Sequence, residues 1–254
     1  MTAREDGFED GFEGPRKKVL VRALERAPFE GWTRAMLQRA GADAGVSRPT
    51  LAAAFPNGAA DLLALWSEKA DAAMAEKMTA PDFAARRIRD KVNFAVRARL
   101  DALRPHKEAA RRAAATLALP IHAGLTMRLV WKTADTIWRG LGDKSTDFNF
   151  YTKRAILAGV WTTTLARWLA DDTPDETKTG DFLAARIDNV MRYEKAKERL
   201  REAGLDPAKP AGWLAKLRYP GKSARPRDEE KIDEALRETF PASDPPYWTS
   251  GVKG

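Results

Sequence analysis

The hydrophobic residues of this 254-residue chain recur at the spacing of α-helices, and strand-like alternation is hard to find. Ala, Leu, Arg, Lys and Glu, which favour helices, dominate over β-branched residues. Prolines fall at expected helix starts or turns, and residues 121–173 contain none. The predicted fold class is therefore all-α. Helices are expected over 15–27, 33–41, 47–54, 59–79, 82–103, 106–118, 124–141, 147–171 and 179–203, with shorter ones over 210–218 and 228–238.

The net charge of +8 is unevenly distributed along the chain. Residues 1–14 and 228–254 are acidic, whereas residues 192–227 carry eleven cations against four acids. Such a basic stretch favours an anionic partner. The predicted organisation is an acidic disordered N-terminus (1–14), a helix-turn-helix-like region (15–80), a helical domain (81–203), a basic amphipathic segment (204–227) and an acidic, largely disordered tail (228–254).

Several function classes lack their required residues. The chain has no cysteine and two histidines, which removes thiolate chemistry and nearly excludes a zinc site. It has no P-loop, Gly-x-Gly-x-x-Gly, Gly-x-Ser-x-Gly or Glu-x-x-His motif. No catalytic residue, metal or cofactor is therefore expected. The acidic N-terminus, without an apolar core, resembles neither a signal peptide nor a mitochondrial presequence, so a cytoplasmic protein is expected.

Residues 31–63 have the pattern of turn and cap residues that is typical of a helix-turn-helix. Gly45 suits the left-handed end of a first helix, and Ser47 can cap a second one that Phe55 ends. The segment resembles the DNA-binding region of TetR-type regulators. However, Arg48 is the only cation between Gly41 and Ser67, and a DNA reader neutralises several phosphates. The motif is predicted to be a degenerate scaffold, with TetR-type DNA binding as the alternative function.

The central helices are rich in aromatic and aliphatic residues. A helix that is apolar on most sides is buried centrally. Two interpretations stay open: a filled aromatic core, as in a pure scaffold, or an apolar pocket for a lipid. The candidate pocket residues are Trp131, Trp138, Leu157, Trp161 and Leu165.

The start of the helix at 147–171 carries a mixed polar and aromatic stripe. Asp147, Phe150, Tyr151 and Arg154 follow an i, i+3, i+4, i+7 spacing and so share one face. Carboxylate, aromatic and arginine groups together are typical of a binding hot spot. The alternative is an ordinary first turn whose aromatics pack inward.

Four runs of sequence resemble one known family. The run GDKSTDFNFYTKRA (142–155) is similar to a signature of the ubiquinone (coenzyme Q) biosynthesis accessory lipid-binding protein family COQ9, and so are residues 93–100, 131–135 and 186–191. The resemblance extends over about 16–195. It implies an all-helical, TetR-like protein that usually forms homodimers and is not an enzyme.

The resemblance also implies a function. The family binds isoprenoid lipids, including quinone intermediates, in an apolar pocket and presents them to the di-iron hydroxylase that acts on demethoxyubiquinone. The partner face implied here consists of Ile137, Asp147, Phe150, Tyr151 and Arg154. Phe150 stands where relatives can have tryptophan, which keeps an aromatic anchor but removes an N–H donor.

The basic segment near the C-terminus is the candidate membrane contact. Its apolar side and flanking cations comprise Trp213, Leu214, Lys216, Leu217 and Arg218. A short basic amphipathic helix with a tryptophan suits an anionic membrane surface, and a solvated basic linker is the alternative. The expected location is cytoplasmic with peripheral association with the inner membrane, and no nucleic acid partner is expected.

Overall fold

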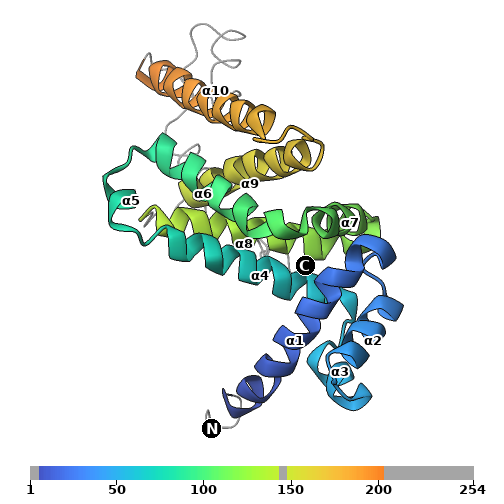
Figure 1. Cartoon of the computed structure of the whole chain (residues 1–254). Coiled ribbons are helices and arrows are strands. Elements are labelled where there is room, and N and C mark those ends of the chain that lie inside the picture. The colour runs from blue at the N-terminus through green and yellow to red at the C-terminus, as the bar shows by residue number, and fades with distance from the viewer. Residues whose placement is uncertain (1–5, 143–147, 203–254) are drawn as a thin grey trace, which may run out of the picture. The chain divides into compact units, whose positions relative to one another are not determined.

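The computed structural model describes residues 6–142 and 148–202, and every regular element within them is a helix, as predicted (Figure 1). The chain divides into a unit over Met1–Tyr193 and a unit over Glu194–Gly254, and the fold below is that of the first unit. The helices are α1 (Asp6–Glu30), α2 (Arg34–Asp43), α3 (Arg48–Ala54), α4 (Ala59–Lys77), α5 (Pro81–Ala85), α6 (Ile88–Leu103), η1 (Arg104–His106), α7 (Lys107–Leu117), η2 (Pro120–His122), α8 (Ala123–Gly140), α9 (Phe148–Leu169) and α10 (Thr177–Glu202).

Helices α2 and α3 form the predicted helix-turn-helix against α1. The Thr33 hydroxyl caps α2 by accepting from the Met36 amide, and the Ser47 hydroxyl caps α3 by accepting from the Thr50 amide. Gly45 between them has φ +67°, a conformation that glycine adopts at little cost. The local turn chemistry read from the sequence is therefore the chemistry that the fold uses.

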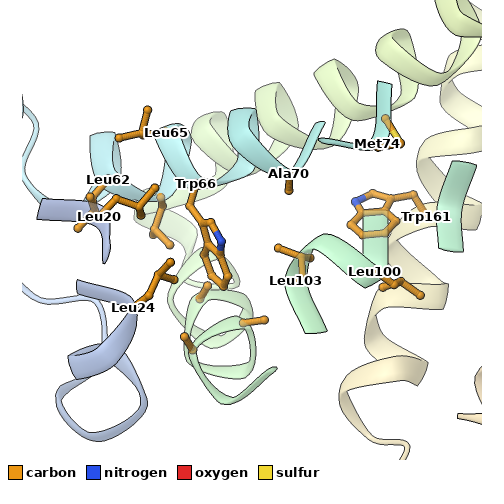
Figure 2. Packing of buried hydrophobic residues seen from close by; sticks show 14 of the residues in the cluster. Leu20, Leu24, Leu62, Leu65, Trp66, Ala70, Met74, Leu100, Leu103 and Trp161 are labelled. Atoms are coloured by element: carbon orange, nitrogen blue, oxygen red, sulfur yellow. The ribbon is translucent and has the colours of Figure 1, made fainter. Parts of the chain in front are cut away.

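The core of the unit is one cluster of buried apolar side chains, with members from α1, α2, α4, α6, α7, α8 and α9 among other helices. Figure 1 shows α4, α6 and α8 running alongside one another, and Figure 2 shows the apolar side chains that fill the space between helices. Trp66 of α4 stacks on Trp32 with ring centroids 5.3 Å apart, and the Trp32 indole N–H donates to the Ala109 carbonyl at 3.0 Å. Trp161 of α9 is buried farther along the same core (Figure 2).

Two predicted boundaries are wrong. The helix predicted over 82–103 is two helices, because Arg86 and Arg87 have extended backbone between α5 and α6. The N-terminal helix begins at Asp6 and not at residue 15, so residues 6–14 are helical although disorder was predicted. Acidic residues are favourable in the first turns of a helix, and Glu13 pairs with Lys17 and Lys69, at 2.7 and 3.5 Å.

A hydrogen-bonded junction fixes α9 and α10 to α7. Asp171, which is buried, accepts from the Thr179 amide and hydroxyl in the first turn of α10 at 2.8 and 2.7 Å. Hydrogen bonds from Thr173 and Thr179 hold the pKa of Asp171 well below its usual range. Arg111 of α7 donates to the Leu169 carbonyl at 2.7 Å, so α7 is held against the end of α9.

Candidate functional site: a cavity in the helical bundle

A cavity of about 380 Å³ lies among α4, α6, α7, α8 and α9. Its volume is in the range of small-molecule sites, which are mostly apolar with a few polar groups. Most of its wall is aliphatic, aromatic or alanine. The apolar lining consists of Leu63 and Trp66 from α4, Leu103 from α6, Ala110, Ala113, Ala114 and Leu117 from α7, Ala118, Leu129 and Val130 from α8 and its approach, and Trp161 and Leu165 from α9.

One part of the wall is polar and is built around a buried ion pair. Arg99 of α6 and Asp71 of α4 are both almost fully buried, and the Arg99 Nε donates to Asp71 Oδ1 at 2.6 Å. The Arg99 Nη2 donates to the Ser67 hydroxyl at 2.8 Å, and the Thr133 hydroxyl donates to Asp71 Oδ1 at 3.0 Å. Arg99, Ser67 and Thr133 line the cavity. The cavity therefore offers hydrogen-bonding groups beside an otherwise apolar wall.

The geometry of this polar cluster stabilises a charged arginine in the core. The Arg99 guanidinium carbon lies 4.3 Å from the ring centre of Trp161, a cation–π arrangement. The second carboxylate oxygen of Asp71, Oδ2, is buried and accepts no hydrogen bond from the described residues. A buried polar atom without a partner is uncommon. Such a cluster can bind the oxygen atoms of a ligand whose remainder is apolar.

The residues predicted to line a lipid pocket separate into two groups. Trp161 and Leu165 line the cavity. Leu157 is buried in the core outside the cavity lining. Trp131 and Trp138 also lie outside the lining: Trp131 packs on Tyr151 with ring centroids 6.1 Å apart, and the Trp138 indole N–H donates to the Lys153 carbonyl at 2.9 Å.

The described residues of the predicted partner face lie at different depths. Tyr151 is half exposed, whereas Ile137 and Arg154 are buried. Arg154 donates to Asp135 of α8 at 2.7 Å, so its guanidinium connects α9 to α8. Phe150 lies in α9, and Asp147 lies outside the described residues.

The predicted membrane segment also lies outside the described residues, with Trp213, Leu214, Lys216, Leu217 and Arg218 all beyond residue 202. Among the residues that are described, no single helix is long and apolar enough to cross a bilayer. The segments Ile88–Leu117 and Pro120–Gly140 reach that length and composition only as a pair, bent by 94°. Within the same residues, no group of three or more potential side-chain ligands is placed to hold a metal ion.

Sequence reasoning missed the α4, α6 and α7 walls of the cavity. The signal that α7 gives is a run of small residues, since Ala110, Ala113 and Ala114 recur on one helical face and leave space beside them. Arg99 gives no comparable signal, because its partner Asp71 is 28 positions away and on another helix.

Comparison with known proteins places the chain in one family. The COQ9 family matches residues 123–194, which cover α8, α9 and most of α10. A rat (Rattus norvegicus) protein named ubiquinone biosynthesis protein COQ9, mitochondrial, is 30% identical over 211 residues, which are 80% of this chain and 67% of that protein. The cattle (Bos taurus) protein of the same name is 30% identical over 194 residues, 74% of this chain and 60% of that protein. The chain thus spans about three fifths to two thirds of the length of these relatives.

The structural comparison concerns the fold alone. A TetR transcriptional regulator from Nitrosomonas europaea superposes with a TM-score of 0.57 at 19% sequence identity, over 68% of this chain and 95% of the regulator. The predicted TetR-like, all-α architecture is therefore confirmed. Together with the sequence relatives, the comparisons confirm the resemblance that the signature at 142–155 indicated: the chain belongs to the COQ9 family.

Proposed function

We propose that this chain is a non-catalytic lipid-binding accessory protein of ubiquinone biosynthesis. It holds an isoprenoid quinone intermediate in the bundle cavity and presents it to the demethoxyubiquinone hydroxylase at a membrane surface. The observation that carries this proposal is the 380 Å³ cavity, which is apolar except for Arg99, Ser67 and three threonines, in a member of the COQ9 family. The named relatives are ubiquinone biosynthesis proteins.

The chemistry of the cavity supports an amphipathic ligand. The alanine-rich α7 wall and the rings of Trp66 and Trp161 suit an isoprenoid hydrocarbon, whose transfer out of water is favourable. A quinone head carries oxygen acceptors, and Arg99 is a donor with five N–H groups. We therefore assign the head to the Arg99 end of the cavity and the tail to the apolar remainder.

Filling the cavity tests the proposal. Ala113 is a buried cavity residue of α7, and Ala115 is an exposed residue of the same helix outside the lining. Ala113→Trp places an indole where the ligand would sit, and Ala115→Trp is the matched control. Equilibrium dialysis with a short-chain ubiquinone is expected to show binding by the wild type and Ala115→Trp, weakened at least about tenfold in Ala113→Trp. No binding by the wild type, or equal binding by both variants, would refute the cavity as the lipid site.

The partner face is proposed to act through the exposed part of α9. Tyr151 is half exposed, while Arg154 and Ile137 are buried and contribute to the packing of α9 on α8. Tyr151→Ala is expected to weaken hydroxylase association in a pull-down without lowering the thermal midpoint. Phe29→Ala, which removes an exposed aromatic ring from α1, is the control. Retained association in Tyr151→Ala would exclude this face.

The remaining parts of the proposal are a homodimer and peripheral association with the inner membrane. An open groove of about 570 Å³ between α9 and α10, lined in part by Ile156, Val160 and Val190, supports contact with a second copy. Light scattering after size-exclusion chromatography is expected to give twice the chain mass. The basic segment around Trp213 is proposed as one membrane contact, and its deletion should weaken binding to anionic vesicles.

A further inference from the structure

The turn between α7 and α8 exposes an unusual group of large apolar side chains. We define the α7–α8 corner as residues 117–127. Leu119, Ile121 and Met127 are 52%, 85% and 69% exposed, and they are three of the eight large hydrophobic residues that are exposed in the described part of the chain. The helical segments on either side meet at an angle of 94°, so the chain turns sharply at the corner. Exposed apolar groups gathered in this way mark interaction sites with proteins or membranes.

The charge around the corner selects between these two partners. The chain has no acidic residue between Glu108 and Asp135, and it has four cations there. Three of these cations are paired with carboxylates: Arg111 and Arg112 with Glu108, and Lys132 with Glu68. Arg128, one residue after Met127, is exposed and forms no ion pair with any described residue. An apolar corner beside such a cation complements a bilayer whose headgroups are anionic.

The backbone of the corner is suited to an apolar environment. The Thr126 hydroxyl donates to the carbonyls of Leu117 and His122 at 2.7 and 3.0 Å. The Leu119 amide donates to the Thr116 carbonyl at 3.2 Å, and the His122 amide donates to the Leu119 carbonyl at 2.9 Å. Polar backbone groups that are paired internally carry a smaller desolvation cost on entering lipid than unpaired ones.

The cavity reaches the protein surface at the corner. Leu117, Ala118 and Thr126 line the cavity, and Ala118 is also exposed. Thr133, which bonds to Asp71 in the polar cluster, lies seven residues after Thr126 on α8, a rise of about 10 Å. The cavity therefore extends from the corner to the Arg99 end.

We propose that the α7–α8 corner enters the interface of an anionic bilayer and is the passage between the bilayer and the cavity. A space of about 380 Å³ suits a drug-sized ligand, so a long polyprenyl tail would extend beyond it. With the head near Arg99, such a tail leaves at the corner and remains in the membrane. The passage rests on the proposed lipid-binding function, whereas insertion of the corner stands on its exposed residues and charge.

Site-specific labelling tests the insertion directly. Because the chain contains no cysteine, Ile121→Cys can carry a single environment-sensitive fluorophore. Phe29→Cys, at an equally exposed position in α1, is the matched control, with 86% exposure against 85%. Vesicles of equal parts phosphatidylcholine and phosphatidylglycerol are expected to shift the emission of the Ile121 label to shorter wavelength and to leave the Phe29 label unchanged.

Three results would overturn insertion. They are no emission shift of the label at residue 121, an equal shift of the label at residue 29, or a shift at residue 121 that a higher protein concentration produces without any vesicles. The last result would assign the corner to contact with a second copy. Ile121→Asp is expected to weaken vesicle binding about tenfold or more, because it puts a charge in place of an apolar side chain that enters the bilayer on binding.

The passage is tested by the rate of lipid transfer. Ile121→Asp should slow the transfer of a long-chain ubiquinone from vesicles to the protein about tenfold, yet leave short-chain ubiquinone affinity in dialysis unchanged. An unchanged transfer rate overturns the passage. Absence of any short-chain binding by the wild type would instead refute the proposed function and leave the insertion result intact, so the two failures are distinguishable.

Discussion

Removal of one member of the buried Arg99–Asp71 pair should strongly destabilise the bundle. Arg99→Met deletes the guanidinium that donates to Asp71 at 2.6 Å and leaves a carboxylate with Oδ2 already unpaired among the described residues. Breaking a buried ion pair in this way costs about 3–5 kcal/mol. A domain of this size has a free energy of unfolding of about 5–15 kcal/mol, so much of the stability is at stake.

The double variant Arg99→Met/Asp71→Val separates charge burial from packing. It replaces both charges with apolar groups, a change that is often neutral or stabilising. The Thr133 hydroxyl, which loses Asp71, keeps its bond to the Leu129 carbonyl at 3.1 Å. We therefore expect the double variant to recover most of the lost stability, but not short-chain ubiquinone affinity, because it still lacks Arg99, the donor that we propose binds the quinone head.

Urea denaturation followed by circular dichroism measures both variants. With a slope of about 2 kcal/mol per molar urea, Arg99→Met should lower the midpoint by about 1.5–2.5 M. The double variant should return to near the wild-type midpoint. A loss below about 1 kcal/mol in Arg99→Met, or no recovery in the double variant, would refute the interpretation that the pair is desolvated and mutually dependent.

Three further predictions concern other parts of the fold. Arg154 and Arg139 both pair with Asp135, but their side chains are 2% and 74% exposed. Arg154→Glu should therefore lower the free energy of unfolding in urea by several kcal/mol, and Arg139→Glu by at most about 1 kcal/mol. Equal losses would refute this prediction. Because folding lowers the pKa of Asp171, the ionised carboxylate stabilises the fold above its ordinary pKa of 3.8, and this contribution is lost as the pH falls below 3.8. In acid titrations Asp171→Asn should therefore lose stability less steeply than the wild type. Parallel curves would contradict the prediction. Fluorescence anisotropy should detect no sequence-specific duplex binding through α3, and tight, steeply salt-dependent binding would support the regulator alternative.

Helix positions were predictable because their end signals are local. The Ser47 cap, the positive-φ Gly45 and the proline at the start of η2 act within a few residues of sequence. The break at Arg86 and Arg87 was not predictable from periodicity. The residues on either side of this break make contacts across it: Arg86 lies over the Phe94 ring at 4.4 Å, and Phe83 packs beside Phe94.

The cavity was only partly predictable because its walls come from five helices. Periodicity identified α9 as apolar on most sides, so Trp161 and Leu165 were found. It could not tell that the two tryptophans of α8 lie outside the cavity lining, where Trp131 packs on Tyr151 and Trp138 donates to the Lys153 carbonyl. Burial of Arg154 could not be predicted either, because the carboxylate that pairs with it, Asp135, lies on another helix.

If the bundle cavity holds an isoprenoid lipid, the lipid should remain bound during purification from cells and be visible in native mass spectrometry. We expect one isoprenoid adduct per chain in the wild type and in Ala115→Trp, and its loss in Ala113→Trp. The absence of any isoprenoid from the wild type under mild conditions, or an adduct that persists equally in Ala113→Trp, would show that the cavity is not the lipid site.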